Sequence, residues 1–195
     1  MKVENTFIYL IGFSGTGKLT IAKELQKLVP AILVDNHLIN NVVFSLIDCD
    51  GVTPLPDEVW DYTWQVRDIV LSTIRHLSKP ERNFIFTNEL IEGSENDAKL
   101  FEEIETLATQ RRANLFPVRL AISIDELCKR IVSPERKSKL KAIDAHDMRE
   151  RAAISKVFIP DHPNRIELDV THLSAVESAK IIASKVRDGL AKQTD

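Results

Sequence analysis

Short apolar runs recur along the chain, separated by longer segments of mixed polarity. The first run, residues 6–11, is rich in β-branched and aromatic residues, and further strand-like runs cover residues 31–34, 83–87, 115–122 and 165–170. Runs of this length and composition are typical of strands that are buried on both faces. The sequence therefore predicts five strands.

Between these runs, apolar residues recur at every third or fourth position, which is the spacing of a helix face. The helical segments with this pattern cover residues 21–28, 59–77, 100–108 and 179–190. Strands that alternate with helices predict an α/β fold, in which a doubly wound parallel sheet carries helices on both faces. Ligands of such sheets bind beyond the carboxyl ends of the strands, so the first candidates for a site are Asp35, Asn88 and Glu89.

Two longer segments interrupt this alternation within a chain whose 195 residues suit a single domain, 1–195. Residues 36–79 form a long excursion between the second and third strands, which we interpret as a substrate-side insertion. Residues 133–151 are polar and rich in lysine and arginine, which we interpret as a mobile lid. We use the names insertion and lid for these two segments below.

Charge and composition exclude several classes of partner. The net charge of -3 offers no general attraction to nucleic acid or to anionic membranes, although the basic lid leaves a nucleic-acid acceptor open as a third possibility. No apolar run reaches the ~18 residues of a membrane span, and the first residues lack the apolar core of a signal peptide. The two cysteines, Cys49 and Cys128, are far apart and outside any metal-binding spacing. We expect a cytoplasmic protein without a membrane anchor.

One motif carries most of the chemical information. Between the first strand and the first helix the chain matches G-x-x-x-x-G-K, as Gly12-Phe13-Ser14-Gly15-Thr16-Gly17-Lys18. Glycines at these positions let backbone N–H groups turn toward phosphate oxygens, the helix N-terminus adds its dipole, and the lysine supplies a positive charge. The sequence therefore predicts a phosphate-binding loop whose nucleotide contacts come from Gly12, Ser14, Gly15, Thr16, Gly17, Lys18, Leu19 and Thr20.

The residue after the lysine departs from this motif. Position 19 should be serine or threonine, whose hydroxyl binds Mg²⁺, but it is Leu19, and the next residue is Thr20. Because Mg²⁺ retains several waters readily, Glu89 is expected to hold it through a water molecule, with Thr20 on a more interior phosphate. The alternative interpretation of Glu89 is a solvated glutamate at the start of a helix. The alternative for the whole site is one that binds nucleotide but turns it over poorly.

Phosphoryl transfer also needs a carboxylate that orients the acceptor hydroxyl and cations that balance the charge of the γ-phosphate. Asp35 is the candidate carboxylate, and the alternative interpretation is that it caps the helix that follows. Arg136 in the lid is the candidate for the γ-phosphate, and Arg130 is better placed to stack on a base. The alternative for these arginines is a solvated helix face.

Three side chains share one predicted helix face in the insertion. Trp60, Trp64 and Arg67 are spaced by four and three residues, so they form a surface that suits a flat or anionic acceptor. The alternative is that at least one tryptophan packs in the core. His37 and Asn88 complete the predicted acceptor contacts.

These motifs together resemble the nucleoside-monophosphate-kinase-like group of P-loop proteins, which includes shikimate kinases, gluconate kinases and chloramphenicol phosphotransferase. The resemblance implies a P-loop NTPase fold with a five-stranded parallel sheet in a three-layer sandwich, a small lid, and transfer of the γ-phosphate of ATP to a small acceptor. It also implies that Asp35 faces the acceptor, Arg130 faces adenine and Arg136 is a lid arginine. Residues 160–165, with Arg165, would close over adenine. Shikimate kinases carry a second aspartate where this chain has His37.

From the sequence we therefore expect an ATP-dependent small-molecule kinase, with Mg²⁺ as its metal and an unidentified small molecule as its acceptor. Lys18, Asp35 and Arg136 are its predicted catalytic residues. The alternative is a nucleotide-binding regulatory module with weak or no catalysis. A serine at position 19 should raise ATP turnover if the protein is an enzyme, but should raise nucleotide affinity at most if it is a binding module.

Overall fold

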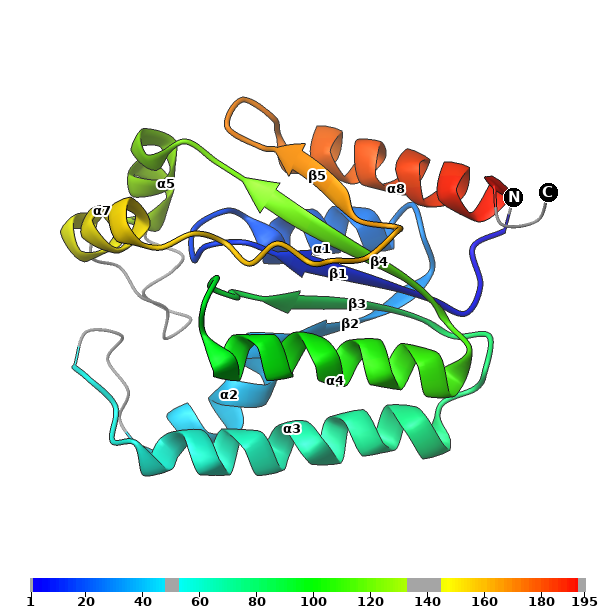
Figure 1. The fold of residues 1–195 in the computed structure, drawn as a ribbon, viewed down its shortest axis with the longest axis horizontal. Coiled ribbons are helices and arrows are strands. Elements are labelled where there is room, and N and C mark those ends of the chain that lie inside the picture. Colours follow the sequence, from blue (N-terminus) through cyan, green and yellow to red (C-terminus); the bar gives the residue numbers. More distant parts are fainter. Residues whose placement is uncertain (1, 48–52, 133–144, 193–195) are drawn as a thin grey trace.

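A twisted parallel sheet forms the centre of the molecule in the computed structural model, which describes residues 2–47, 53–132 and 145–192 (Figure 1). Its strands lie in the order β2-β3-β1-β4-β5, and every pair is parallel. Their bounds are β1 Thr6–Ile11, β2 Ala31–Asp35, β3 Asn83–Asn88, β4 Asn114–Ala121 and β5 Ile166–Asp169. All five strands fall where the apolar runs predict them.

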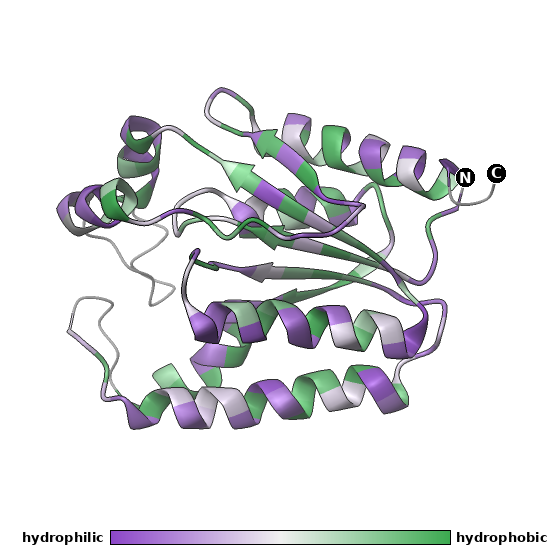
Figure 2. Cartoon of the chain, viewed as in Figure 1, coloured by the Kyte–Doolittle hydropathy of each residue, from purple (hydrophilic) through white to green (hydrophobic). Residues whose placement is uncertain are grey.

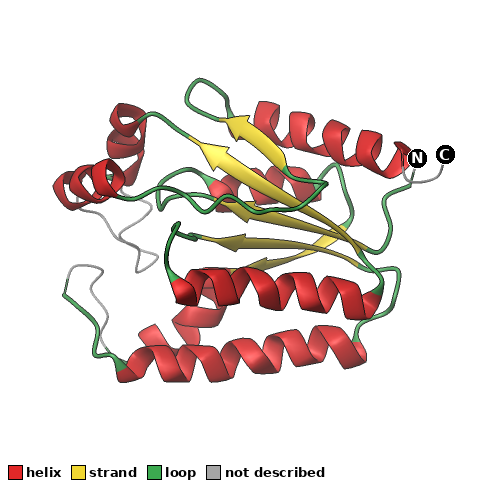
Figure 3. Cartoon of the chain, viewed as in Figure 1, coloured by secondary structure: helices red, strands yellow, loops and turns green. Residues whose placement is uncertain are grey.

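Helices cover both faces of this sheet, which gives the predicted three layers (Figure 3). In chain order they are α1 Lys18–Gln26, α2 Asn36–Phe44, α3 Glu58–Leu77, α4 Glu95–Arg111, α5 Ile124–Ile131, α7 Ala145–Ile154 and α8 Ala175–Lys192. Helices α1 and α8 pack together on one face, and α3 and α4 lie on the other (Figure 1). Within the described ranges, no helix is long and apolar enough to cross a bilayer.

Burial on both faces explains why the central strands are almost continuously apolar (Figure 2). Along β1, Ile8 and Leu10 point into the core beneath α1 and α8, whereas Phe7, Tyr9 and Ile11 point into the core beneath α3 and α4. Each of these five side chains is fully buried. The period of two along a strand therefore divides one apolar run between two cores.

The strand order determines where a ligand can bind. Strand β1 lies between β3 and β4, so the chain that leaves β1 crosses over to β2 at the sheet edge and returns through β3. A crevice forms beyond the carboxyl ends of such strands, where neighbouring connections run in opposite directions. Ile11 and Asn88 are register partners at this edge, so the segments that follow them start side by side.

A glycine within α8 offers a test of the packing between this helix and the sheet. A methyl group on Gly189 would lie 2.6 Å from Cε1 of Phe116, whose ring is buried and held between layers. We expect Gly189→Ala to lower the free energy of unfolding by about 1–3 kcal/mol despite the better helix propensity of alanine. Thermal unfolding measures this, with the exposed Ser184→Ala on the same helix as the control. An unchanged or raised midpoint would contradict the packing.

Candidate functional site

The phosphate loop connects β1 to α1 in a conformation that requires glycine. Gly15 and Gly17 have φ of 93° and 95°, values that other residues rarely adopt. A Cβ on Gly15 would also lie 2.9 Å from Cδ1 of Leu127. Gly17 is the N-cap residue of α1 and makes no side-chain cap, so the first backbone N–H groups of the helix stay available to an anion.

Hydrogen bonds within the loop hold this conformation. The Thr16 hydroxyl donates to the Phe13 carbonyl at 2.6 Å. Lys18 Nζ donates to the carbonyls of Gly12 and Phe13 at 2.7 and 2.9 Å. The ammonium group is therefore held over the loop itself, which is where the terminal phosphates of a nucleotide bind in a loop of this kind.

A carboxylate reaches the same loop from the neighbouring strand. Glu89 follows β3, and its Oε2 accepts a hydrogen bond from the Ser14 N–H at 2.8 Å. Its Oε1 lies 2.9 Å from Nη2 of Arg151 in α7, and the Glu89 side chain is only 16% exposed. A negatively charged group thus lies on one of the amides that the loop offers to phosphate, and it is ion-paired to an arginine of the lid.

Backbone pairing explains how Arg151 comes to lie beside Glu89. The segment after α7 runs antiparallel to the segment after β3, with a bridge between Ile91 and Val157. The Glu92 N–H donates to the Lys156 carbonyl, and the Phe158 N–H donates to the Leu90 carbonyl, both at 2.9 Å. This pairing ties the end of α7 to the chain directly after Glu89.

The contact between Glu89 and Ser14 predicts competition with phosphate. We expect Glu89→Gln to tighten nucleotide binding in the absence of Mg²⁺ roughly five- to tenfold, because it removes a charge that repels phosphate and weakens the acceptor on the Ser14 N–H. Titration calorimetry with ADP in the presence of a chelator measures this. The matched control is Glu92→Gln, an exposed carboxylate on the same segment. Weaker binding by Glu89→Gln would contradict the competition.

Asp35 lies at the end of β2 and faces the same crevice. It occupies the N-cap position of α2, but its side chain makes no capping hydrogen bond, so the capping interpretation has no support. Its Oδ1 instead accepts a hydrogen bond from the Thr87 hydroxyl, which in turn accepts one from the Asn36 N–H at 3.3 Å. The Asp35 side chain is 14% exposed, and its Oδ2 lies 3.9 Å from Nδ1 of His37. The carboxylate is therefore oriented by its neighbours.

One cavity of about 750 Å³ contains both the phosphate loop and Asp35. Most of the predicted site residues line it, namely Ser14, Gly15, Gly17, Lys18, Leu19, Thr20, Asp35, His37, Trp60, Trp64, Arg67, Asn88, Glu89 and Arg130. The insertion contributes one wall through α2 and α3, and the start of α4 contributes another through Asn96 and Asp97. The loop, the candidate acceptor carboxylate and the insertion helices thus face one space.

Asp97 is a lining residue that the sequence did not single out. Its Oδ2 accepts a hydrogen bond from the Ile91 N–H at 2.8 Å. Burial raises the pKa of the Asp97 carboxyl, and the Ile91 hydrogen bond opposes that shift. Asp97 lies one turn into α4, after the Ser94 N-cap, where an acidic residue is common for reasons of helix stability alone. No local signal therefore distinguished it as a site residue.

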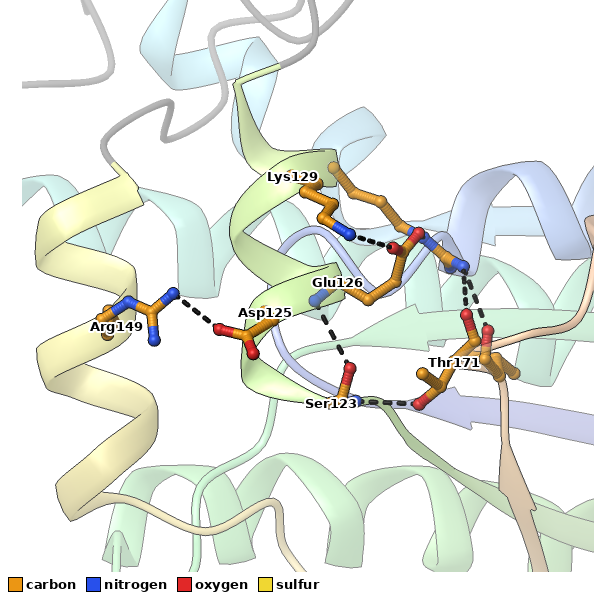
Figure 4. A network of polar contacts seen from close by, with 8 residues as sticks. Ser123, Asp125, Glu126, Lys129, Arg149 and Thr171 are labelled. Atoms are coloured by element: carbon orange, nitrogen blue, oxygen red, sulfur yellow. Dashed lines mark hydrogen bonds and ion pairs between the residues drawn. The ribbon is translucent and has the colours of Figure 1, made fainter.

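Arg130 joins the phosphate loop to the connection that follows β5. Its Nη1 donates to the Thr16 carbonyl at 3.4 Å, and its Nη2 donates to the carbonyls of Val170 and Thr171 at 3.1 and 3.3 Å. Its Nε lies 2.9 Å from Oε1 of Glu126, and this guanidinium lowers the pKa of the Glu126 carboxyl. Figure 4 shows the polar contacts of α5, including those of Ser123, Asp125 and Glu126.

The rest of that network connects α5 to its neighbours. The Ser123 N–H donates to the Thr171 hydroxyl at 2.9 Å, which ties the start of α5 to the connection after β5 (Figure 4). Arg149 of α7 donates to Asp125 at 2.8 Å, which ties the described part of the lid to α5. Arg130 itself is bonded to the phosphate loop, to the connection after β5 and to Glu126, so it does not lie on a solvated helix face.

A second, smaller hollow lies beside Arg130, on the far side of the loop. It measures about 260 Å³ and is lined by Thr16, Gly17, Thr20, Ile21, Arg130, Leu173, Ser174 and Ala175. The sequence did not predict residues 173–175 here, although the rule that selected Asp35 and Asn88, reading the residues after each strand, also applies to the chain after β5.

Three predictions for this site need comment. Arg165 precedes β5, lines neither hollow and bonds instead to the Pro160 carbonyl and Glu167, so its placement does not support closure over a base. Arg136 lies outside the described residues. Trp60 and Trp64 both line the cavity, and neither is buried in the core. Trp60 is 45% exposed.

Comparison with known proteins places the fold. No protein-family model matches the chain, and no curated protein matches its sequence. Among solved structures, it is similar to a gluconokinase from Sinorhizobium meliloti 1021, with a TM-score of 0.63 at 13% identity over 100% of both chains. It is also similar to the shikimate kinase of Aquifex aeolicus, with a TM-score of 0.53 at 14% identity over 95% of this chain and 99% of that one.

A third similar structure is the thymidylate kinase of Candida albicans, with a TM-score of 0.57 at 13% identity over 95% of this chain and 92% of that one. All three are P-loop kinases, and the likeness extends over nearly the whole chain. The protein therefore has the α/β fold of P-loop kinases, as the resemblance in the sequence implies.

Proposed function

We propose that this protein is an ATP-dependent phosphotransferase that moves the γ-phosphate to a hydroxyl group of a small molecule. The observation that carries this proposal is the single cavity that contains both the phosphate loop and the oriented carboxylate of Asp35. The space beside the phosphate loop gives an acceptor room to bind next to the terminal phosphates. Kinases for a sugar acid, for shikimate and for a nucleotide share the fold, which supports the same class of chemistry.

The residues divide between nucleotide and acceptor. In this proposal the loop amides and Lys18 hold the β- and γ-phosphates, and Arg130 contacts the base. Arg130 lines both the cavity and the smaller hollow, which supports a contact with the nucleotide. Asp35 accepts the proton of the acceptor hydroxyl, whose oxygen bonds to the γ-phosphorus while the bond from that phosphorus to the bridging oxygen of ADP breaks. Thr87 positions Asp35 for this step. Arg136, from the lid, balances the charge of the transferred group.

The oxygen ligands in the cavity decide whether Mg²⁺ fits this site. Leu19 offers no ligand, and no cluster of three or more metal-binding side chains occurs in the described ranges. Glu89 and Asp35 still supply hard carboxylate oxygens to the same cavity, and Mg²⁺ accepts one or two carboxylates together with phosphate oxygens and waters. The residues therefore fit a magnesium ion held largely by the nucleotide, with Glu89 acting through water. When bound, the ion would neutralise charge on the phosphates.

Transfer of labelled phosphate tests the proposal. The protein is incubated with ATP labelled at the γ-position and with a panel of small alcohols, and label is followed into the acceptor rather than into free phosphate. Transfer that depends on both Lys18 and an acceptor supports the proposal. Nucleotide binding without transfer to any alcohol, and without ATP hydrolysis above background, would overturn it.

The residue at position 19 favours a second candidate, a nucleotide-binding regulatory module with little catalysis. Leu19→Ser restores the hydroxyl that normally binds Mg²⁺. If metal positioning limits an enzyme, we expect turnover to rise roughly tenfold, equivalent to about 1.4 kcal/mol of barrier. Steady-state kinetics across Mg²⁺ concentrations measures this, with Leu19→Ala as the matched control. A gain in nucleotide affinity without any gain in turnover would favour the regulatory module.

A further inference from the structure

The part of the cavity beyond the phosphate loop has an aromatic wall. Helix α2 presents Phe44 and helix α3 presents Trp60 and Trp64, all of which line the cavity. The rings of Phe44 and Trp60 meet edge to face, with centroids 6.0 Å apart and an interplanar angle of 81°. The Trp60 side chain remains 45% exposed, so much of the indole is available to a ligand. Such a surface suits the apolar face of a ring.

The cavity is also lined by a buried amide, the side chain of Asn88, that has an unpaired donor within the described part of the chain. Asn88 is 3% exposed and lines the cavity, and its Nδ2 has no hydrogen-bond partner among the residues described. A buried donor without a partner is unfavourable, and a ligand oxygen placed there would accept its hydrogen bond. Asn36, Asn40 and Thr63 add further neutral donors and acceptors around the space. Hydroxyl groups complement such a lining because each of them both donates and accepts.

Two arginines that line the cavity are already paired with carboxylates. Arg67 is 5% exposed, its Nε lies 2.7 Å from Oε2 of Glu103, and its Nη2 donates to the Leu100 carbonyl at 3.3 Å. Arg151 is paired with Glu89 at 2.9 Å. In the described part of this wall, no arginine is left to balance a charge on the acceptor.

Two further cations of the cavity, Lys18 and Arg130, are bonded to carbonyls of the phosphate loop, and the other charged residues are mainly acidic. Asp35 and Asp97 both face the space, and His37, when protonated, is itself balanced by the nearby Asp35 carboxylate. On binding here, a ligand carboxylate would be desolvated without gaining an unpaired cation as a partner. The free-energy cost of that desolvation would weaken its binding strongly. A neutral hydroxylated ring avoids this cost, and an ammonium group gains from the acidic groups.

We propose, on the basis of the proposed phosphotransferase function, that the acceptor is a hydroxylated ring without an acidic group, either neutral or amine-bearing. The apolar face of the ring lies against Trp60 and Phe44, and one of its oxygens accepts from Asn88. Acceptors with a carboxylate at this end are excluded by the ion pairs of Arg67 and Arg151. In this respect the cavity differs from one built for a sugar acid.

Three probes that share one pyranose ring test this charge selection: glucose, glucosamine and glucuronate. Their binding is measured by calorimetry on the full chain with a non-hydrolysable ATP analogue and Mg²⁺, and transfer is measured in parallel with ATP. We expect glucose and glucosamine to bind at least about tenfold more tightly than glucuronate, a difference of about 1.4 kcal/mol. Equal or tighter binding of glucuronate, or no binding of any of the three, would overturn the proposal.

A variant that frees Arg67 tests the cause of the selection. Glu103 lies outside the lining residues, so Glu103→Gln removes the charge that balances Arg67 without altering the walls. We expect the preference for glucose over glucuronate to fall by roughly five- to tenfold, while the affinity for ATP stays the same. Glu102→Gln, an exposed neighbour on α4, is the matched control. An unchanged preference in the Glu103 variant would refute the role of the ion pair.

These measurements separate the two proposals. If the neutral and aminated rings bind in the expected order but no phosphate reaches them, the acceptor class stands and the phosphotransferase function fails. If glucuronate binds best and is phosphorylated, the acceptor class fails and the phosphotransferase function stands.

Discussion

Lys18→Ala is expected to remove most of the stabilisation of this protein by nucleotide. The ammonium group lies over the loop, within 2.9 Å of two of its carbonyls, and is the loop's own charged contact to the terminal phosphates. A nucleotide at a hundred times its dissociation constant adds about 2.7 kcal/mol, or roughly 5 to 10 °C in the midpoint of a chain of this length. Loss of a charged hydrogen-bond donor, worth about 1.5–3 kcal/mol, removes most of that shift.

Thermal unfolding with ATP, ADP and GTP, each with and without Mg²⁺, measures this effect. Lys23→Ala, an exposed lysine on the same helix, is the matched control and should keep the full shift. The unliganded midpoint of each variant shows whether the loop still folds. A nucleotide shift that survives in the Lys18 variant would mean that the anion binds elsewhere.

Asp35→Asn is expected to lower the rate of phosphate transfer by about 10² to 10⁴, the usual range for removal of a general base. The substitution keeps the size of the side chain and an oxygen that can still accept from Thr87. Asp35 makes no capping hydrogen bond to α2, so the substitution should leave the stability of this helix unchanged. ATP binding and the unfolding midpoint should therefore change little.

Single-turnover kinetics with saturating ATP and acceptor measures this loss directly. The control is Asp61→Asn, which removes an exposed carboxylate from α3. A folded Asp35 variant with full transfer activity would show that another group takes the proton.

The strands and the phosphate loop could be predicted because their signals are local. Thr6–Ile11 is buried on both faces and reads as an unbroken apolar run, so its strand and its central position both follow from composition. Gly15 and Gly17 adopt backbone angles that only glycine adopts readily, so their spacing alone indicates the turn. The likeness of fold to solved kinases at 13 to 14% identity agrees with this prediction.

The detailed site could be predicted only in part. The rule that ligands bind after parallel strands selected Asp35, Asn88 and Glu89, and all three line one cavity. The same rule extends to the chain after β5, where Leu173 and its neighbours line the smaller hollow beside Arg130, but these residues are not among the predicted site residues. Asp97 was missed because a helix start explains an acidic residue equally well.

By itself, the sequence determined the α/β class, the strands, the phosphate loop and the missing hydroxyl at position 19, because each depends on neighbours in the chain or on backbone angles. Only the tertiary structure decided how the charged groups pair. Glu89 lies on the Ser14 amide, 75 positions away, and Arg67 is neutralised by Glu103, 36 positions away. In the sequence Arg67 suits an anionic acceptor, but within the folded chain its charge is already balanced. The energy of a charge depends on its partner and its exposure, and folding brings both from distant parts of the chain.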